Sequence, residues 1–165
     1  HEARQLASLS HPNVVSFLEV GSHEGHDFLV MEFLEMGELS AYVRTLSVAA
    51  ILGVFVQICD GLAHLHDTGI VHRDIKPANL LIMQDCTVKI CDFGLSRGFG
   101  EVEDVLKKTA YVVTRWYRAP EVSLLNKSYN QSLDMWSAGC IFAELMQRAV
   151  LFPGDTNATE VIMIL

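Results

Sequence analysis

His72-Arg73-Asp74-Ile75-Lys76-Pro77-Ala78-Asn79 is the most informative stretch of this 165-residue sequence. It is polar and contains a proline, so we expect a loop there rather than a helix or a strand. Two shorter motifs follow along the chain, first Asp92-Phe93-Gly94 and then Ala119-Pro120-Glu121. Either tripeptide alone would carry little information, so the set and its order are what matter.

A long helix is predicted before this loop. Ser47 is a suitable N-cap, because its hydroxyl can accept a hydrogen bond from the first turn of the helix. Apolar residues then recur at spacings of four and three, namely Ile51, Phe55, Ile58, Leu62 and Leu65. This spacing places them on one side of a helix, which we expect to be buried in a core.

Two pairs of short strands are predicted as well. Residues 14–20 and 27–32 are β-prone and are separated by the polar, glycine-containing stretch 21–26, as in a hairpin. The second pair is Leu80–Ile82 and Val88–Ile90, on either side of the turn residues Gln84 and Asp85.

Two further segments have a distinct character. Residues 94–118 show mixed charge and no sustained period, so we expect a long surface segment, and long loops in compact domains usually carry function. Residues 132–146 combine apolar and small side chains, which predicts a helix buried nearly all round.

Composition excludes several classes of function. The formal net charge is −8, from 12 Lys and Arg against 20 Asp and Glu, which argues against non-specific binding of nucleic acid or anionic lipid. The apolar stretches are interrupted before about 18 residues, so no membrane span is expected. The four cysteines lack CxxC spacing, so neither a metal nor a disulfide framework is predicted, and a cytoplasmic or nuclear location fits best.

The three motifs together resemble the catalytic loop, the magnesium loop and the end of the activation segment of eukaryotic protein kinases. The resemblance implies an α+β, protein-kinase-like fold that is truncated at both ends. Residues 1–33 would be the remainder of the small β-rich lobe, from helix C to the hinge. Residues 34–165 would be most of the helical large lobe, through the start of helix G. We therefore expect one partial kinase domain, with little activity on its own.

The resemblance implies ATP as the phosphoryl donor and Mg²⁺ as the cofactor. Phosphoryl transfer requires mainly an aligned hydroxyl and cations on the γ-phosphate oxygens. Asp74 is the candidate base for the substrate hydroxyl. Lys76 can neutralise charge on the transferred group, and a lysine there accompanies Ser/Thr specificity in this family. Asn79 and Asp92 offer the hard oxygen ligands that Mg²⁺ prefers.

The same resemblance assigns a nucleotide site. Glu2 matches the helix C glutamate that pairs with a phosphate-binding lysine, which would precede residue 1. Met31 would be the gatekeeper, Glu32 and Leu34 would offer backbone hydrogen bonds to adenine, and Leu81 would form the apolar floor. A purely structural strand end remains the alternative for the last four residues.

A hydrophobic stack that links the two lobes is also implied. His72 and Phe93 would belong to it, together with Leu6 and Phe17 from the small lobe. Asp134 would anchor the stack from the predicted helix 132–146. For His72 and Phe93 the purely structural interpretation, a position in the core, agrees with the functional one.

A further string, Thr114-Arg115-Trp116-Tyr117-Arg118-Ala119-Pro120-Glu121, narrows the group. An arginine immediately before Ala-Pro-Glu resembles the CMGC group, which contains the mitogen-activated and cyclin-dependent kinases. In that group the arginine helps to form a pocket that accepts proline after the target residue. Protein substrates with Ser-Pro or Thr-Pro sites are therefore expected.

Thr109-Ala110-Tyr111 occupies the place of the dual phosphorylation motif of mitogen-activated kinases. Phosphate adds about −1.5 to −2 charge to each hydroxyl, and cationic side chains can hold it. Arg73 and Arg97 would serve Thr109, and Arg115 and Arg118 would serve Tyr111. This predicts activation by an upstream kinase, although an exposed Thr and Tyr without regulatory role remain the alternative.

Two features depart from the mitogen-activated pattern. His1 stands where those relatives place an additional arginine, and the stretch 36–39 is one residue longer than the corresponding turn. A function of a different class also stays open, namely a catalytically inactive scaffold that binds partners through a kinase fold.

Overall fold

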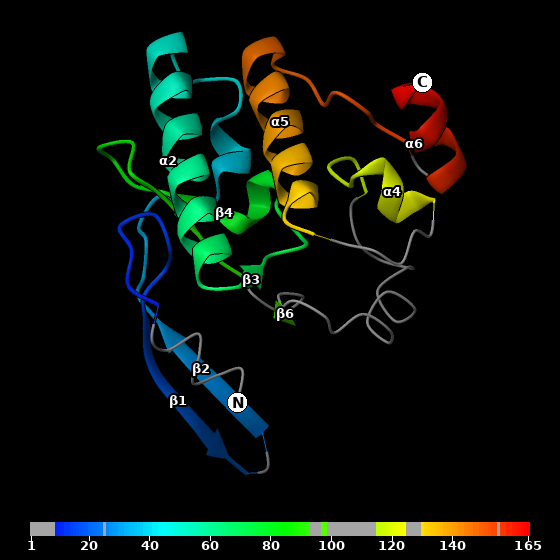
Figure 1. The fold of residues 1–165 in the computed structure, drawn as a ribbon. Coiled ribbons are helices and arrows are strands. Elements are labelled where there is room, and N and C mark those ends of the chain that lie inside the picture. The colour runs from blue at the N-terminus through cyan, green and yellow to red at the C-terminus, as the bar shows by residue number, and fades with distance from the viewer. Residues whose placement is uncertain (1–8, 25, 93–96, 99–114, 125–129, 155) are drawn as a thin grey trace.

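The computed structural model describes residues 9–24, 26–92, 97–98, 115–124, 130–154 and 156–165. A two-stranded hairpin projects from a body in which two long helices, α2 and α5, lie side by side (Figure 1). The strands are β1 Phe17–His23, β2 His26–Met31, β3 Ile70–Val71, β4 Leu80–Ile82, β5 Val88–Ile90 and β6 Arg97–Gly98. The helices are α2 Val48–Asp67, α4 Pro120–Ser123, α5 Ser132–Gln147 and α6 Asn157–Ile164, with 3-10 turns η1 Leu39–Tyr42 and η2 Pro77–Asn79.

The hairpin is antiparallel, as predicted, but its bounds differ from the prediction. Register runs from Phe17 opposite Met31 to His23 opposite His26, so the turn is shorter than 21–26. Gly21 belongs to β1 rather than to the turn, since it pairs with Phe28 of β2. The ring of Phe28 occupies the space that a side chain at position 21 would fill. β1 also starts later than residue 14.

Residues 13–15 pair with the body instead of the hairpin. Ile90 of β5 donates its backbone N–H to Asn13 O and accepts from Val15 N–H, both at 2.9 Å. Val14 and Val15 are buried in the core, which favours this pairing over an exposed strand. The hairpin therefore begins at Ser16, immediately after a segment fixed to β5.

α2 is the central helix of the body. The Ser47 hydroxyl accepts a hydrogen bond from Ala50 N–H at 3.2 Å, so the predicted N-cap is confirmed. Four residues of the predicted stripe are fully buried, namely Ile51, Ile58, Leu62 and Leu65, and so is Val54, which the prediction did not include. Phe55 is half-buried and packs on Phe142 of α5, with ring centroids 4.4 Å apart. By length and mean hydropathy α2 would also suit a membrane span, but its buried stripe and its packing on α5 are those of a core helix.

A buried amide network joins residues 13–15 to α2 and to the β4–β5 pair. The Asn13 side chain donates to Gln57 Oε1 and to Val88 O, both at 2.9 Å. Gln57, on α2, also accepts from Val88 N–H and donates to Cys86 O, again at 2.9 Å. The network satisfies polar groups that the core would otherwise leave unpaired, so it orients the base of the hairpin on the body.

α5 is less completely buried than the sequence suggested. Residues such as Asp134, Ala138 and Ile141 are buried, whereas Met135 and Met146 are nearly half exposed. The helix ends at Gln147 and is followed by its C-cap Arg148, which adopts a left-handed conformation with φ 65°. Its guanidinium donates to the carbonyls of Val43 and Leu46, so it joins the end of α5 to the segment before α2.

His11 lies at the junction between the segment 13–15 and α2. Its ring stacks on His64 of α2 with centroids 4.8 Å apart, and its Nδ1 accepts a hydrogen bond from Asn13 N–H. Burial and the neighbouring His64 lower the pKa of His11, against a weaker opposite effect of Asp60. The folded state therefore disfavours the protonated ring.

This geometry predicts a pH dependence of stability. Because the pKa of His11 is lower in the folded chain than its ordinary value of 6.5, the folded state binds fewer protons. The stabilisation is complete above about pH 6.5 and is lost as the pH falls below it. In His11→Asn an amide oxygen can still accept a hydrogen bond from Asn13 N–H, but the side chain does not titrate. The free energy of unfolding, measured with urea at several pH values between 5 and 7.5, should therefore change less steeply with pH than in the parent protein. An unchanged slope would mean that His11 is not the titrating group.

Candidate active site

The loop 72–79 follows β3 and closes on the 3-10 turn η2. Pro77 occupies the first position of η2, where its fixed φ is favourable and its missing N–H costs nothing. Asn79 N–H donates to Lys76 O at 2.9 Å. The loop is therefore compact, and it holds Asp74, Lys76 and Asn79 within one turn of each other.

The start of the loop is anchored to α5 by Asp134, whose side chain is fully buried. Its carboxylate accepts from His72 N–H at 2.9 Å and from Arg73 N–H at 2.8 Å. His66 of α2 donates to the same carboxylate from Nε2 at 2.9 Å. Arg73 has φ 69°, a conformation that costs an L residue about 1–2 kcal/mol. The hydrogen bonds to Asp134 offset that cost.

The His72 ring connects the loop to the segment that precedes Asp92. Its Nε2–H donates to Cys91 O at 2.9 Å, while Nδ1 accepts from Asp74 N–H at 3.3 Å. These two roles require the neutral Nε2–H tautomer. Cys91 N–H in turn donates to Asn79 O at 2.9 Å. Two hydrogen bonds thus fix residue 91, and with it the start of residue 92, against the loop.

The Asp74 carboxylate is held by two neighbours. Its Oδ2 accepts from Lys76 Nζ at 2.6 Å and from Asn79 Nδ2 at 3.0 Å. Asn79 Nδ2 also donates to the Asp74 backbone carbonyl at 2.8 Å. Both amide hydrogens of Asn79 therefore point to Asp74, and its oxygen is directed elsewhere. The structure brings together the three residues that the sequence predicted as catalytic.

The donor set suits a magnesium ion. The Asn79 amide oxygen is a hard ligand, and Asp92 follows directly on Cys91, which is hydrogen-bonded to Asn79. Asp92 is exposed and has φ 61°. Among the described residues no three His, Cys, Asp or Glu side chains form a metal cage. Such an open, two-ligand arrangement fits Mg²⁺, which keeps waters and takes phosphate oxygens.

The electrostatics of this corner are acidic. Burial, followed by the carboxylates of Asp92 and Glu38, raises the pKa of the Cys91 thiol to about 11. The thiol is therefore neutral at physiological pH. Lys76 has a weaker opposite effect on this pKa.

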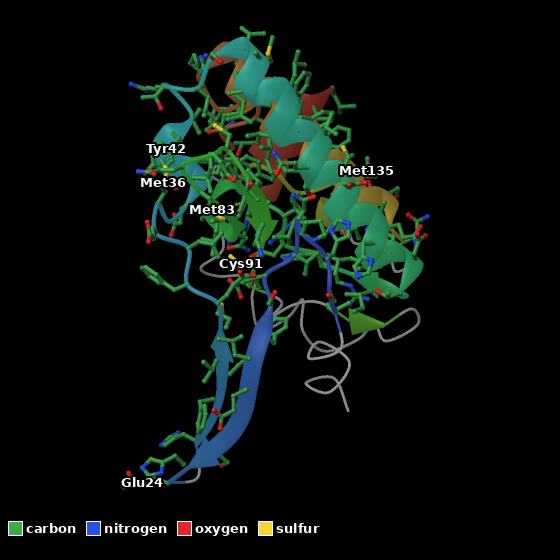
Figure 2. All side chains as sticks on the ribbon, turned by 90° about the vertical axis from the view of Figure 1, so that its left-hand side faces the viewer. Glu24, Met36, Tyr42, Met83, Cys91 and Met135 are labelled. Carbon is green, nitrogen blue, oxygen red and sulfur yellow. The ribbon has the colours of Figure 1, made fainter. Side chains whose placement is uncertain are left out.

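Cys91 lies close to where the hairpin joins the body (Figure 2), and the predicted adenine-binding residues Met31, Glu32 and Leu34 lie at and just after the end of β2. Met31 ends β2 and is about two-fifths exposed. Glu32 N–H donates to Ser16 O at 3.0 Å, which leaves the Glu32 carbonyl as the group that can face a base. The Leu34 carbonyl accepts from Gly37 N–H, so Leu34 would contribute its own N–H. Leu81 lies on β4 opposite Lys89, whose ammonium reaches Glu32.

The segment 115–119 is fixed on α5. Tyr117 is buried, and its hydroxyl donates to Glu144 Oε2 at 2.6 Å. Burial and this hydrogen bond raise the pKa of the Tyr117 hydroxyl. Ser137 Oγ–H donates to Tyr117 O at 2.7 Å. Because Tyr117 is held on both sides, Arg118 has a defined position just before α4.

Several predicted residues lie outside the part of the chain that the structure describes, namely Glu2, Leu6, Phe93, Thr109 and Tyr111. Arg97 lies in β6, which pairs with β3 and so brings its backbone beside Val71, close to Arg73. Phe17 begins β1 and is half-buried against the main core. The predicted anchoring of His72 by Asp134 is present in the structure.

Among the interactions that sequence reasoning missed, two lie near the candidate site. One is the ion pair between Glu32 and Lys89, and the other is the hydrogen bond from Tyr117 to Glu144. A signal for the first existed, because Lys89 alternates with the buried Val88 and Ile90 and must face away from that core. Its partner could not be deduced, since the pair joins distant parts of the chain.

Asp134→Asn should weaken the fold substantially. An asparagine replaces one acceptor oxygen with an NH₂ group that would face a backbone N–H, leaving a buried donor unpaired. We expect a loss of about 3 kcal/mol in the free energy of unfolding, measured by urea denaturation of the full-length protein. Met135→Ala, on the exposed side of the same helix, is the control and should cost less than about 1 kcal/mol. Equal losses in the two variants would contradict the anchoring role.

Comparisons with known proteins agree with this geometry. The family model described as Protein kinase domain matches residues 1–165. Mitogen-activated protein kinase 14 of Xenopus laevis is 40% identical over 99% of this chain and 46% of its own length. Cyclin-dependent kinase F-4 of Oryza sativa subsp. japonica is 40% identical over 99% of this chain and 35% of its own length. The chain thus spans less than half the length of these two relatives.

A solved structure shows the same fold. The yeast RNA Pol II CTD kinase CTDK-1 complex contains a chain with a TM-score of 0.84 and 32% sequence identity, covering 99% of this chain and 54% of that one. The predicted protein-kinase-like fold is therefore confirmed, and the relatives are kinases of the predicted CMGC group. From its motifs, its fold and these matches, the chain belongs to the protein kinase family.

Proposed function

We propose that this chain carries the catalytic loop of an ATP- and Mg²⁺-dependent protein Ser/Thr kinase. The observation that supports this most strongly is the fixed Asp74 carboxylate, hydrogen-bonded to Lys76 and Asn79, with Asn79 in turn bonded to Cys91, the residue before Asp92. A scaffold that had lost catalysis would have no need to keep this set of side chains in such close contact. The kinase family and the named relatives favour the same conclusion.

In the proposed reaction the substrate hydroxyl lies beside Asp74. Its oxygen forms a bond to the γ-phosphorus of ATP, the bond from that phosphorus to the bridging oxygen of ADP breaks, and Asp74 accepts the hydroxyl proton. Lys76 Nζ lies 2.6 Å from Asp74 Oδ2, where it can also neutralise charge on the transferred group. Asn79 and Asp92 would hold Mg²⁺, which neutralises charge on the phosphate oxygens.

We propose proline-directed substrates, with Ser-Pro or Thr-Pro sites. Arg118 precedes Ala119 and Pro120, and its position is fixed through Tyr117, Ser137 and Glu144. The similarity to mitogen-activated and cyclin-dependent kinases supports this assignment. A rigid segment here would let the enzyme select the residue that follows the target.

We also propose regulation by phosphorylation of Thr109 and Tyr111 by an upstream kinase. Both lie in the sequence between the magnesium loop and the anchored segment 115–119. The cations expected to hold the phosphates are Arg73, Arg97, Arg115 and Arg118.

The four cysteines are free thiols, which suits the proposed cytoplasmic or nuclear location.

A phosphotransfer assay tests the proposal. The full-length protein, treated with an activating kinase, is given ATP, Mg²⁺ and a peptide with one Ser-Pro site, or a matched peptide with Ser-Ala. We expect faster phosphorylation of the Ser-Pro peptide. Asp74→Asn should lower kcat at least about 100-fold, because general-base and positioning contributions of that size are typical.

The outcomes separate the alternatives. An unchanged rate in Asp74→Asn would refute the assigned role of Asp74, and equal rates on the two peptides would refute proline direction. No phosphotransfer by the parent protein, despite cooperative folding, would favour the scaffold function.

A further inference from the structure

The chain passes between the hairpin and the body at two points, just before Ser16 and just after Met31. The first passage is fixed by backbone hydrogen bonds from residues 13–15 to Ile90 and by the Asn13 amide network. The second passage contains Glu32, whose backbone N–H donates to Ser16 O. The side chain of Glu32 makes further contacts, with Ser16 and with Lys89.

One carboxylate oxygen of Glu32 accepts two hydrogen bonds. Ser16 N–H donates to Glu32 Oε1 at 2.7 Å, and Lys89 Nζ donates to the same oxygen at 2.6 Å. Ser16 belongs to the base of the hairpin, whereas Lys89 belongs to β5 of the body. A single carboxylate therefore bonds to both parts of the molecule.

The ion pair is shielded from water. The side chain of Lys89 is 14% exposed and that of Glu32 is 29% exposed. Burial alone would raise the pKa of Glu32, but the hydrogen bonds from Lys89 and Ser16 outweigh it and lower the pKa. Glu32 is therefore charged at neutral pH, and solvent screens this partly buried pair less than a fully exposed one.

The pair lies beside the proposed nucleotide site. Lys89 is the β5 partner of Leu81, and it alternates with the buried Val88 and Ile90, whereas Leu81 is partly buried and packs against the core. Glu32 carries the backbone carbonyl that we expect to face adenine. If the Glu32 side chain moved away from Lys89, the Glu32 carbonyl would thus shift relative to Leu81, the residue expected beneath adenine.

We propose that Glu32 and Lys89 are positioning residues that tie the base of the hairpin to β5 and fix the hinge for nucleotide binding. The nucleotide part of this inference rests on the proposed kinase function. Loss of the tie would leave the backbone hydrogen bonds between residues 13–15 and Ile90 in place. This loss should therefore alter nucleotide affinity without unfolding the chain.

The test uses the full-length protein and its variants Lys89→Met, Glu32→Gln, the double variant and Lys89→Arg. Glu24→Gln is the matched control, because it removes the same charge from an exposed glutamate at the far tip of the hairpin (Figure 2). Amide hydrogen exchange at residues 16 and 32 is measured without nucleotide. ADP affinity with Mg²⁺ is measured by calorimetry, and KM for ATP and kcat by phosphotransfer.

Both single variants should exchange these amides faster and bind ADP roughly threefold to tenfold more weakly, with KM for ATP raised more than kcat is lowered. The double variant should be no worse than the worse single variant, because both remove one interaction. Lys89→Arg and Glu24→Gln should stay within about twofold of the parent protein, while cooperative melting confirms that all variants fold.

Unchanged exchange and affinity in the single variants, or additive losses in the double variant, would overturn the proposal. Equal losses in Lys89→Arg and Lys89→Met would also do so, because the arginine keeps the charge. A parent protein that binds no nucleotide would refute the kinase function and the positioning role together. In that case faster exchange in Lys89→Met would still establish the tie itself.

Discussion

The buried carboxylate of Asp134 is the contact on which the candidate active site depends. It accepts the backbone N–H groups of His72 and Arg73 and the ring N–H of His66, so it joins α5, α2 and the loop 72–79. A buried carboxylate is tolerated only when its oxygens are hydrogen-bonded, and here backbone donors supply that need. Because His72 and Arg73 bind Asp134 through their backbone N–H groups, the conformation at the start of the loop does not depend on what the loop side chains bind.

The His72 ring connects the Asp134 anchor to the residues with proposed chemical roles. The ring lies between Asp74 N–H and Cys91 O, and Cys91 N–H returns to Asn79. Asp74 and the segment leading into Asp92 are thus held by one buried imidazole that needs no charge. Under the proposed kinase function, this arrangement would provide a preorganised proton acceptor and, from Asn79 and Asp92, oxygen ligands for a cation, as phosphoryl transfer requires.

Local patterns predicted much of this, and contacts between distant parts of the chain were harder to foresee. Helical spacing and a cap predicted α2, and short β-prone runs predicted β4 and β5. The start of β1 was wrong, because the pairing of Val14 with Ile90 depends on burial that no local pattern shows. The motif resemblance gave Asp74, Lys76 and Asn79, but Lys89 has no motif and acquires its role from the fold.

The most direct measurement of the central claim is a crystal structure of the full-length protein with Mg²⁺ and a non-hydrolysable ATP analogue. We expect a metal about 2.0–2.1 Å from the Asn79 amide oxygen and from an Asp92 carboxylate oxygen, with Asp74 facing the γ-phosphate across an open space for a hydroxyl. Adenine should face the Glu32 carbonyl. A metal held by other side chains, or a nucleotide bound away from the hinge, would contradict it.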